Sequence, residues 1–458
     1  MSRGVHLSIG MDVGTTTYHW TVHRLAFGVE AGGTSRHVLR EGRPVARSPV
    51  RLTPFCHGDV LDEETIRRTV EADLLKVGLR PQDLETGSVI ITGMAARRRN
   101  APRLIASLSA LFPRLVSTVA GARLESILAA RGAGADLLSR RRLTRVLNVD
   151  IGGGTTNLAL YDCGRLVGSA CLALGARLVH FDREGRVLSW NGEVLGKILR
   201  PPPALPPARA DDDLLGRMGE KVVEALWNFL KGGDLPGVVV EYDEMPRRPV
   251  RFDTVSFTGG VGALLKACRS MPLTRFNDLG VSLARAVRER FGSFPLHESN
   301  GDSIRATSVG ASVHLVQVAG RSVHVTAVQD LPLRGLPAIS VRLGEAADSR
   351  PFRMDPGLRP PCAYAVRAGP GVTLEALKEL ADRLLGEVLT GGARVLVVVF
   401  DQDLGKIFGR IVQSRPDWDP ALRVVSIDSV ELQDGEIVDI GAPTRSGLLP
   451  VTVKTLHF

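Results

Sequence analysis

Two stretches of the chain carry the same short pattern, in which an apolar run leads to an aspartate, a glycine and then threonines. The first is Asp12-Val13-Gly14-Thr15-Thr16-Thr17, and the second is Asp150-Ile151-Gly152-Gly153-Gly154-Thr155-Thr156. A second strand-like run follows each pattern, so each predicts a β-hairpin. One such turn says little, because an ordinary hairpin explains it equally well. Two turns in matching context predict two similar halves that face each other across a nucleotide.

The residue types in these turns suit the binding of a phosphate group and a cation. Glycine has no Cβ, so the backbone N–H groups can approach an anion closely. The threonine hydroxyls add donors, and Asp12 and Asp150 stand where carboxylates could hold a hydrated divalent cation. The predicted phosphate-binding residues are Gly14, Thr15, Thr16, Thr17, Gly152, Gly153, Gly154, Thr155 and Thr156.

A third glycine turn follows the apolar run 254–257, where the pattern predicts a strand that leads into a helix. Only backbone is presented at Gly259, Gly260 and Val261, so a planar base and its ribose could lie against this turn. A plain strand-to-helix turn without a ligand is the alternative.

Two segments rich in small residues, 120–134 and 305–311, predict helices that can approach each other closely. Such a pair suits a hinge between two halves. Glu125 stands near the start of the first helix. On its own, this position is typical of a carboxylate that interacts with the positive end of the helix dipole.

Length, charge and cysteine usage narrow the class of protein. The 458 residues are enough for two to four domains. The formal net charge of +9 arises from scattered arginines, and only 5% of the residues are aromatic, which argues against a nucleic-acid partner. The five cysteines include no Cys-x-x-Cys pair, which favours a reducing compartment without a structural metal site. Because no stretch resembles a membrane span or a secretory leader, we expect a cytoplasmic protein without a membrane partner.

The composition changes near residue 320, which predicts a separate α/β unit in the last part of the chain. Its expected strands are 322–328, 394–400, 422–427 and 451–456, and its expected helix is 373–389. Asp401 and Asp403 could be a metal pair, but a helix N-cap and dipole partner is favoured. The expected division is therefore 1–144, 145–320 with a proline-rich loop at about 198–212, and 321–458.

The two hairpins, the Phe257-Thr258-Gly259-Gly260 turn and the two small-residue helices together resemble the nucleotide-binding elements of the actin, heat-shock chaperone and sugar kinase superfamily. The resemblance implies an α/β fold, with duplicated actin-like (ribonuclease H-like) ATPase domains around a cleft and an additional C-terminal α/β unit. In bacterial actins of the cell-shape type, a glutamate that positions the attacking water precedes Gly-Ala-Gly by seven residues. Glu125 stands at that spacing before Gly132-Ala133-Gly134, so the resemblance gives it this role.

Within the superfamily, the whole chain resembles the ethanolamine ammonia-lyase reactivating factors. The resembling segments extend from residue 7 to 456 and include 89–93, 99–101, 124–134, 146–155, 258–262, 305–307, 401–406, 438–441 and 450–456. This implies an ATP-dependent, chaperone-like protein that opens the adenosylcobalamin-dependent lyase, releases damaged cobalamin and lets intact coenzyme rebind. Cobalamin would be contacted only through the lyase. A homodimer and association with a bacterial microcompartment are left open.

The resemblance also implies the cofactors and the roles of the site residues. MgATP, and ADP after hydrolysis, would lie between the halves, with Asp12 and Asp150 holding Mg²⁺ through water. Glu125, Asp150 and Asp12 would form the catalytic group. The chain departs from the family at Met94, where an acidic residue is usual, and in its proline-rich stretch.

Three other functions would use the same kind of cleft. A small-molecule kinase needs a general-base aspartate for its acceptor, and no clear candidate stands in the connecting helices. A phosphohydrolase of the exopolyphosphatase type fits the length and type of the C-terminal unit poorly. A nucleotide-gated scaffold without turnover is the third alternative, to which Met94 points.

Overall fold

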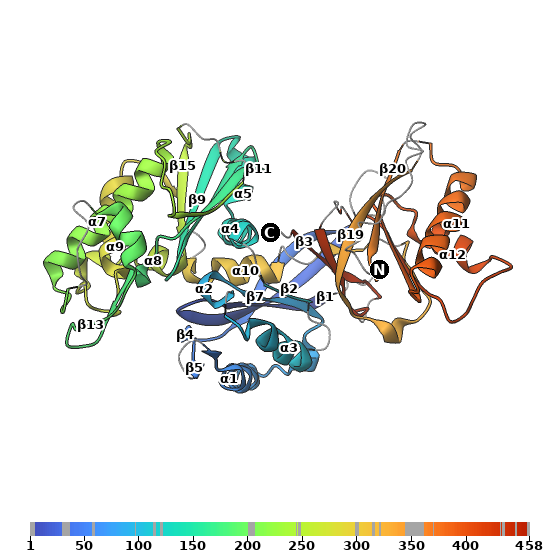
Figure 1. The fold of residues 1–458 in the computed structure, drawn as a ribbon, viewed down its shortest axis with the longest axis horizontal. Helices are drawn as coiled ribbons and strands as arrows, with labels where there is room; N and C mark the ends of the chain where they lie inside the picture. Colours follow the sequence, from blue (N-terminus) through green and yellow to red (C-terminus); the bar gives the residue numbers. More distant parts are fainter. Residues whose placement is uncertain are drawn as a thin grey trace.

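Two α/β lobes and a C-terminal α/β unit make up the computed structural model (Figure 1). The described residues are 5–29, 37–56, 60–96, 98–112, 116–119, 122–199, 207–243, 245, 249–297, 302–313, 317–319, 322–343, 361–369, 371–430, 432, 436–444 and 447–455. The expected proline-rich stretch lies largely outside them, because residues 200–206 are not described.

The first lobe is built on a sheet whose strand order is β3-β2-β1-β7-β8. Its strands are β1 (Val5–Val13), β2 (Thr17–Val29), β3 (His37–Arg47), β7 (Thr86–Ile91) and β8 (Val116–Val119), with the short β4 (Arg51–Leu52) beside β2. Strand β1 is antiparallel to β2 and parallel to β7. The helices α1 (Glu63–Lys76) and α3 (Ala101–Leu111) pack on one face through buried residues such as Ile66, Val70 and Leu104. The two-residue strands β5 (Phe55–Cys56) and β6 (Val60–Leu61) pair beside them.

The second lobe repeats this arrangement in a sheet with the order β14-β11-β10-β9-β15-β16. Its strands are β9 (Arg145–Ile151), β10 (Thr156–Asp162), β11 (Arg165–Leu172), β14 (Val239–Asp243), β15 (Thr254–Thr258) and β16 (Leu296–His297). Strand β9 is antiparallel to β10 and parallel to β15, as β1 is to β2 and β7. This repetition confirms the expected duplicated ribonuclease H-like fold.

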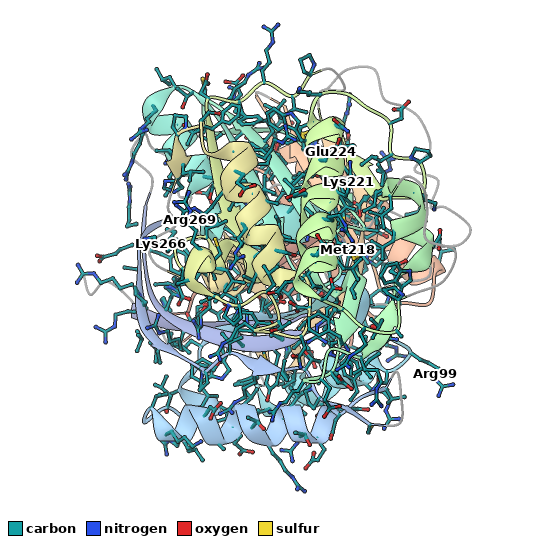
Figure 2. All side chains as sticks on the ribbon, turned by 90° about the vertical axis from the view of Figure 1, so that its left-hand side faces the viewer. Arg99, Met218, Lys221, Glu224, Lys266 and Arg269 are labelled. Atoms are coloured by element: carbon teal, nitrogen blue, oxygen red, sulfur yellow. The ribbon has the colours of Figure 1, made fainter. Side chains whose placement is uncertain are left out.

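Helices α7 (Asp212–Leu230) and α9 (Gly280–Phe291) run side by side on the outer face of the second lobe (Figure 2). The Asp211 side chain accepts a hydrogen bond from the Leu214 amide at 2.8 Å and caps α7, as the acidic run predicts. Met218 faces the core, while Lys221 and Glu224 form an ion pair of 2.7 Å. The short helices of this lobe are α6 (Gly192–Ile198) and α8 (Gly259–Leu264), and β12 (Val179–Phe181) pairs with β13 (Val187–Trp190).

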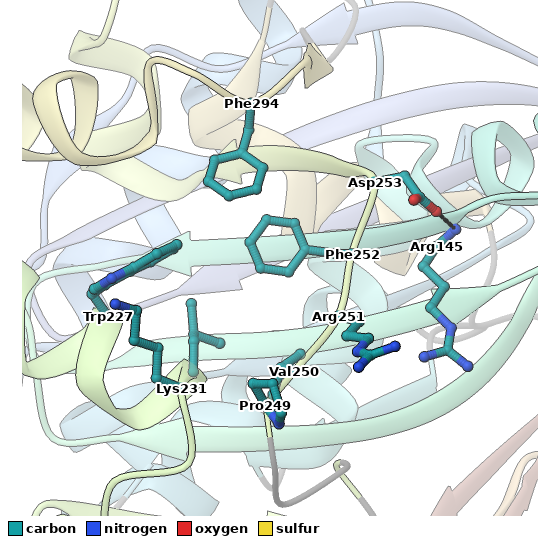
Figure 3. Close-up of a pocket in the computed structure, with 10 residues that line it drawn as sticks. Arg145, Trp227, Lys231, Pro249, Val250, Arg251, Phe252, Asp253 and Phe294 are labelled. Carbon is teal, nitrogen blue, oxygen red and sulfur yellow. Dashed lines mark hydrogen bonds between the residues drawn. The ribbon is translucent and has the colours of Figure 1, made fainter.

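A cluster of aromatic rings closes the end of this lobe that lies at the start of β9. Trp227 at the end of α7 packs edge-on against Phe291, with a distance of 5.2 Å between the ring centroids. The rings of Phe252 and Phe294, whose centroids lie 4.9 Å apart, are beside Trp227 (Figure 3). A shallow pocket of about 460 Å³ opens beside these rings, and Lys231 lies 5.3 Å from the Trp227 ring at its edge. The pocket is at the opposite end of β9 from Asp150.

Two small-residue helices cross between the lobes, as predicted: α4 (Ala122–Gly132) and α10 (Ala306–Val313) (Figure 1). A Cβ on Gly132 would lie 1.8 Å from the Ala306 carbonyl oxygen, and one on Gly310 would lie 2.1 Å from that of Leu128. Only glycine permits so close an approach. Each helix covers the other half's sheet, because α4 and α5 (Ala135–Arg142) pack on the second sheet and α10 packs on the first.

The C-terminal unit is an eight-stranded sheet with the order β17-β24-β23-β19-β20-β21-β22-β18. Its strands are β17 (Gln317–Val318), β18 (His324–Val325), β19 (Leu333–Leu343), β20 (Ala363–Ala368), β21 (Val395–Phe400), β22 (Arg423–Ile427), β23 (Glu436–Ile440) and β24 (Pro450–Thr455). Helices α11 (Leu374–Thr390) and α12 (Gly405–Gln413) cover one face. The unit meets the first lobe where β17 and β24 contact β3 and β8.

Two expectations for this unit are corrected. The strand expected at 322–328 is only His324–Val325, because the chain turns into a 3₁₀ helix at Val328–Asp330. Asp401 is not a helix N-cap: its Oδ1 accepts a hydrogen bond from the Ala368 amide at 3.1 Å, and Leu404 occupies the N-cap of α12. Within the described residues, no cluster of three or more potential metal ligands is present here or elsewhere.

Candidate functional site

The two hairpins, the third glycine turn and the starts of both crossing helices meet in one cleft between the lobes. Asp12 and Asp150 lie near the ends of the central strands β1 and β9, where parallel neighbours also end. The residues that line the cleft are Asp12, Gly14, Thr15, Thr16, Thr17, His19, Thr92, Gly93, Glu125, Asp150, Gly152, Gly153, Gly154, Thr155, Gly259, Gly260, Ile304 and Thr307. Most of the residues predicted for the site are thus brought together, although they come from distant parts of the chain.

Two of the predicted residues do not line the cleft. The Thr156 hydroxyl is buried and donates a hydrogen bond to the Leu174 carbonyl at 2.6 Å, so it is already used inside the second lobe. Val261 is only 2% exposed and packs in the core of the same lobe. Thr156 and Val261 therefore stabilise the second lobe and do not line the cleft.

Three carboxyl groups share the cleft, and burial dominates their electrostatics. Burial raises the pKa of Asp12 to about 7 and that of Asp150 to about 6, and the Asp150 charge adds to the rise at Asp12. The pKa of Glu125 is raised well above its usual value by burial and by the two aspartates. A bound cation would favour the ionised forms of all three groups. Because no three of the described side chains form a cluster that could ligate a metal ion directly, these carboxyl groups fit an ion held through water, such as hydrated Mg²⁺.

Hydroxyl and backbone donors hold the three carboxyl groups in place. Thr92 Oγ1 donates to Asp12 Oδ1 at 2.9 Å, and Thr258 Oγ1 donates to Asp150 Oδ1 at 2.6 Å. The Gly93 amide lies 3.4 Å from Glu125 Oε2. These bonds lower the pKa of each carboxyl group and partly oppose the effect of burial. Each acid is therefore fixed in orientation before any ligand arrives.

Two glycines of the cleft have a conformation that other residues rarely adopt. Gly93 has a φ of 57°, and a Cβ there would lie 2.8 Å from Thr15 Oγ1. Gly259 has a φ of 77°, and a Cβ there would lie 2.5 Å from the Ile151 carbonyl oxygen. Both positions therefore require glycine, and the second explains why the third turn lies against the Asp150 strand.

Asn157 is a cleft-side residue that the sequence reasoning missed. It is paired with Asp150 in the β9–β10 ladder and is only 1% exposed. Its amide lies close enough to lower the pKa of both Asp150 and Glu125, although neither of its polar atoms forms a hydrogen bond of normal geometry. A buried amide without a partner is costly, which indicates a group that a bound ligand or water would satisfy.

His19 is the second such residue, and it lines the cleft directly. It lies opposite Asp12 in the β1–β2 ladder, and neither ring nitrogen has a hydrogen-bond partner. Burial, helped by the nearby Arg305 charge, lowers the pKa of His19 to about 3, so the ring is neutral near pH 7. Its place seven residues after Asp12, on the same face of the hairpin, is the signal that could have identified it.

The cleft is narrow, with a volume of about 60 Å³. Pockets that take nucleotide-sized ligands have volumes of about 300 Å³ or more. In this arrangement of the lobes, the cleft is therefore smaller than a site that holds a whole nucleotide.

The sequence of the whole chain matches the family described as ethanolamine utilisation protein EutA over residues 5–458. It is 33% identical to the ethanolamine ammonia-lyase reactivase EutA of Salmonella typhimurium strain LT2, over 99% of this chain and 98% of that protein. The chain belongs to the EutA family. It is also 32% identical to the reactivase of the same name from Escherichia coli K12, again over 99% and 98% of the two chains.

A comparison with solved structures gives matches of low sequence identity. A Ppx/GppA family protein of Aquifex aeolicus is 14% identical, with a TM-score of 0.36 over 68% of this chain and 88% of that chain. None of the helices that the structure describes combines the length and the apolar composition needed to cross a lipid bilayer.

Proposed function

We propose that this EutA-family chain is an ATP-dependent, chaperone-like reactivating factor for adenosylcobalamin-dependent ethanolamine ammonia-lyase. The observation that carries the proposal is the meeting of Asp12 and Asp150 in one cleft whose walls belong to two similar lobes. Relatives named as reactivases that match nearly the whole chain support the choice of lyase. The protein would release damaged cobalamin so that intact coenzyme can rebind, and would contact cobalamin only through the lyase.

The chain's own groups suggest how it would handle MgATP. Asp12 and Asp150 would hold Mg²⁺ through water, and the hydroxyls of Thr15, Thr16 and Thr155 would donate to phosphate oxygens together with backbone N–H groups. Mg²⁺, when bound, neutralises charge on the phosphates. Glu125 would accept a proton from the attacking water and orient it.

Hydrolysis would be coupled to the lyase through movement of the lobes. The cleft is too narrow for a triphosphate, so nucleotide would bind a more open arrangement than the one described. A difference of a few kcal/mol in affinity between open and closed forms is enough to shift their populations strongly. The two lobes and the C-terminal unit would thus present a different surface to the lyase in each nucleotide state.

The test is ATP hydrolysis without any added acceptor, with and without cyanocobalamin-blocked lyase. A reactivating factor hydrolyses ATP and restores lyase activity when fresh coenzyme is present, whereas a kinase needs its acceptor and a scaffold hydrolyses nothing. Asp150→Ala should lose both activities together. Wild-type turnover in that variant would refute the assignment of the site.

The remaining expectations stay proposals. They are the division at residues 144 and 320, a cytoplasmic location, a microcompartment association and a homodimer. Whether Met94 alters ATP turnover is a separate question. The substitution Met94→Glu introduces the acidic residue that the family resemblance leads us to expect at this position, and a changed rate of ATP hydrolysis would show that Met94 matters.

A further inference from the structure

A second cavity, of about 740 Å³, opens between the lobes at the other end of the crossing helices. The nucleotide cleft touches the starts of α4 and α10 at Glu125 and Thr307, whereas this groove touches their ends at Arg131 and Val313. Arg131 lies six positions after Glu125 in α4, which is about 9 Å along the helix axis. We call this cavity the arginine groove.

Both lobes contribute walls to the arginine groove. Strands β2 and β3 of the first lobe supply one wall, from Thr21 to Arg47. The end of α4 and helix α5, which pack on the second sheet, supply the other wall, and Val309 and Val313 of α10 line it between them. A shift of the lobes therefore changes the width of the groove.

The lining of the groove is basic. The lining contains two carboxylates, those of Glu41 and Asp302, and five arginines. The arginines are Arg40, Arg47, Arg131, Arg140 and Arg141. Asp302 is already bound by Arg47 at 2.9 Å. Arg140 and Arg141 are exposed on α5, and no ion pair is found for either of them within the described residues. The groove is therefore complementary to a ligand that carries negative charge.

The groove is also apolar between its arginines. Its apolar residues come from both walls and from α10, and include Leu39, Val45, Leu137, Val309 and Val313. Among the described lining residues the one aromatic side chain is His23, which is 6% exposed and lies 2.8 Å from the Ser312 hydroxyl through its Nδ1. Single-stranded nucleic acids bind proteins largely by stacking on aromatic rings, so this lining suits them poorly. Arginines that surround aliphatic side chains suit a peptide with both acidic and apolar residues.

We propose that the arginine groove binds an acidic segment of a partner protein, with apolar side chains of that segment against Leu137, Val309 and Val313. If the proposed function holds, the acidic segment belongs to the lyase. Only this assignment of the segment to the lyase rests on the proposed function. Arg140 and Arg141 make the ionic contacts, and the position of the groove at the ends of α4 and α10 couples its width to the nucleotide cleft.

The test uses the full chain and a fluorescein-labelled 12-residue peptide of alternating glutamate and leucine, with fluorescence anisotropy as the readout. Arg140→Glu/Arg141→Glu should weaken binding at least tenfold. The matched control is Arg142→Glu/Arg165→Glu, which makes the same change of charge at exposed positions outside the groove and should stay within twofold of the wild type. Equal affinity of the groove variant and the wild type would overturn the proposal.

Two further arms separate the partner classes and the two proposals. A 12-nucleotide deoxythymidine oligomer, added at the same total concentration of negative charge as the peptide, should not displace the peptide. If it does, the groove would be assigned to nucleic acid instead of an acidic peptide. MgATP affinity is measured on the same proteins. Loss of peptide binding by the groove variant with MgATP binding intact supports the groove. Wild-type protein that binds the peptide but neither hydrolyses ATP nor reactivates lyase would refute the proposed function and leave the groove standing.

Discussion

Thr16 of the first hairpin and Gly153 of the second are in direct contact across the cleft, because a Cβ on Gly153 would lie 2.0 Å from Thr16 Oγ1. The Gly153 carbonyl in turn accepts a hydrogen bond from the Arg177 amide at 2.6 Å. The glycine is thus enclosed by both lobes. The contact with Thr16 therefore requires glycine at position 153. This reason is separate from the close approach of an anion, which also favours glycine.

Gly153→Ala should disturb the meeting of the two hairpins. The added methyl group would collide with the Thr16 side chain, so one of the two turns must change its local conformation, and its phosphate-binding groups would be misplaced. We expect MgATP affinity, measured by isothermal titration calorimetry, to fall about tenfold or more.

The control for this substitution is Gly216→Ala in the interior of α7, where a Cβ would meet nothing within 4 Å. Alanine is the better helix former, so this variant should gain about 1 kcal/mol in unfolding free energy and bind MgATP normally. Unchanged MgATP affinity in Gly153→Ala would mean that the contact is not part of the nucleotide site.

Glu125→Gln should separate binding from hydrolysis. Glutamine keeps the shape and can still accept the Gly93 N–H, but it cannot take a proton from water. Because general-base catalysis contributes about 10²- to 10⁴-fold, single-turnover hydrolysis should fall by at least about 100-fold while MgATP affinity stays within about threefold. A variant that hydrolyses ATP at the wild-type rate would remove Glu125 from the mechanism.

His19→Phe should reveal whether the neutral imidazole donates to the nucleotide. Phenylalanine fills a similar volume without polar atoms, so a purely packing role would leave nucleotide binding unchanged. Because both ring nitrogens lack partners in the cleft, we expect MgATP to bind about fivefold to tenfold more weakly, at about 1–1.5 kcal/mol per lost hydrogen bond. The thermal midpoint without nucleotide should not fall, since no internal hydrogen bond is lost.

Asp278 should make the free protein less stable as the pH rises. Burial raises the pKa of Asp278 to about 6, although the Gly280 amide at 2.8 Å and the Arg177 charge oppose the rise. The folded form then holds its proton more tightly than the unfolded chain. The stability contribution present below pH 4 is therefore lost as the pH passes through about 6.

The measurement is urea unfolding without Mg²⁺ at pH 4.5 and pH 7. Between pH 4.5 and the folded pKa of about 6, at about 1.4 kcal/mol per pH unit, Asp278 should account for about 2 kcal/mol of the decline in unfolding free energy. The asparagine of Asp278→Asn cannot ionise. The unfolding free energy of this variant should therefore decline between pH 4.5 and pH 7 by that much less than the unfolding free energy of the wild type. Because the cleft carboxyl groups are identical in both proteins, the difference between the two declines isolates Asp278. Equal declines would contradict the assignment.

The strand, turn and helix patterns near the cleft were readable because short-range chemistry dictates them. The hairpins at Asp12 and Asp150, the helix start at Glu125 and the turn at Gly259 all have the predicted form. The repetition of one hairpin pattern also predicts a duplicated fold, because segments with the same pattern of apolar and polar residues form the same local structure. The resemblance of the whole chain to the ethanolamine ammonia-lyase reactivating factors is confirmed by the match to the EutA family.

Side-chain direction was not readable in the same way. Thr156 looks like one more phosphate donor in the sequence, but the pleat turns its hydroxyl toward the Leu174 carbonyl. Thr92 and His19 line the cleft, and Thr258 holds Asp150 from the neighbouring strand β15. Only the pairing of the strands brings these residues to Asp12 and Asp150. Asp401 failed as an N-cap because the neighbouring strand β20 offers its side chain the Ala368 amide.

The central claim is that one magnesium–triphosphate is held from both lobes at once, by Asp12 and by Asp150. A double-mutant cycle of Asp12→Asn and Asp150→Asn, with MgATP affinity measured by calorimetry, tests it directly. Each single variant should lose about tenfold or more, and the double variant should lose clearly less than the product, because both residues act on the same hydrated ion. Losses that multiply independently, or single variants that bind MgATP as the wild type does, would contradict the account.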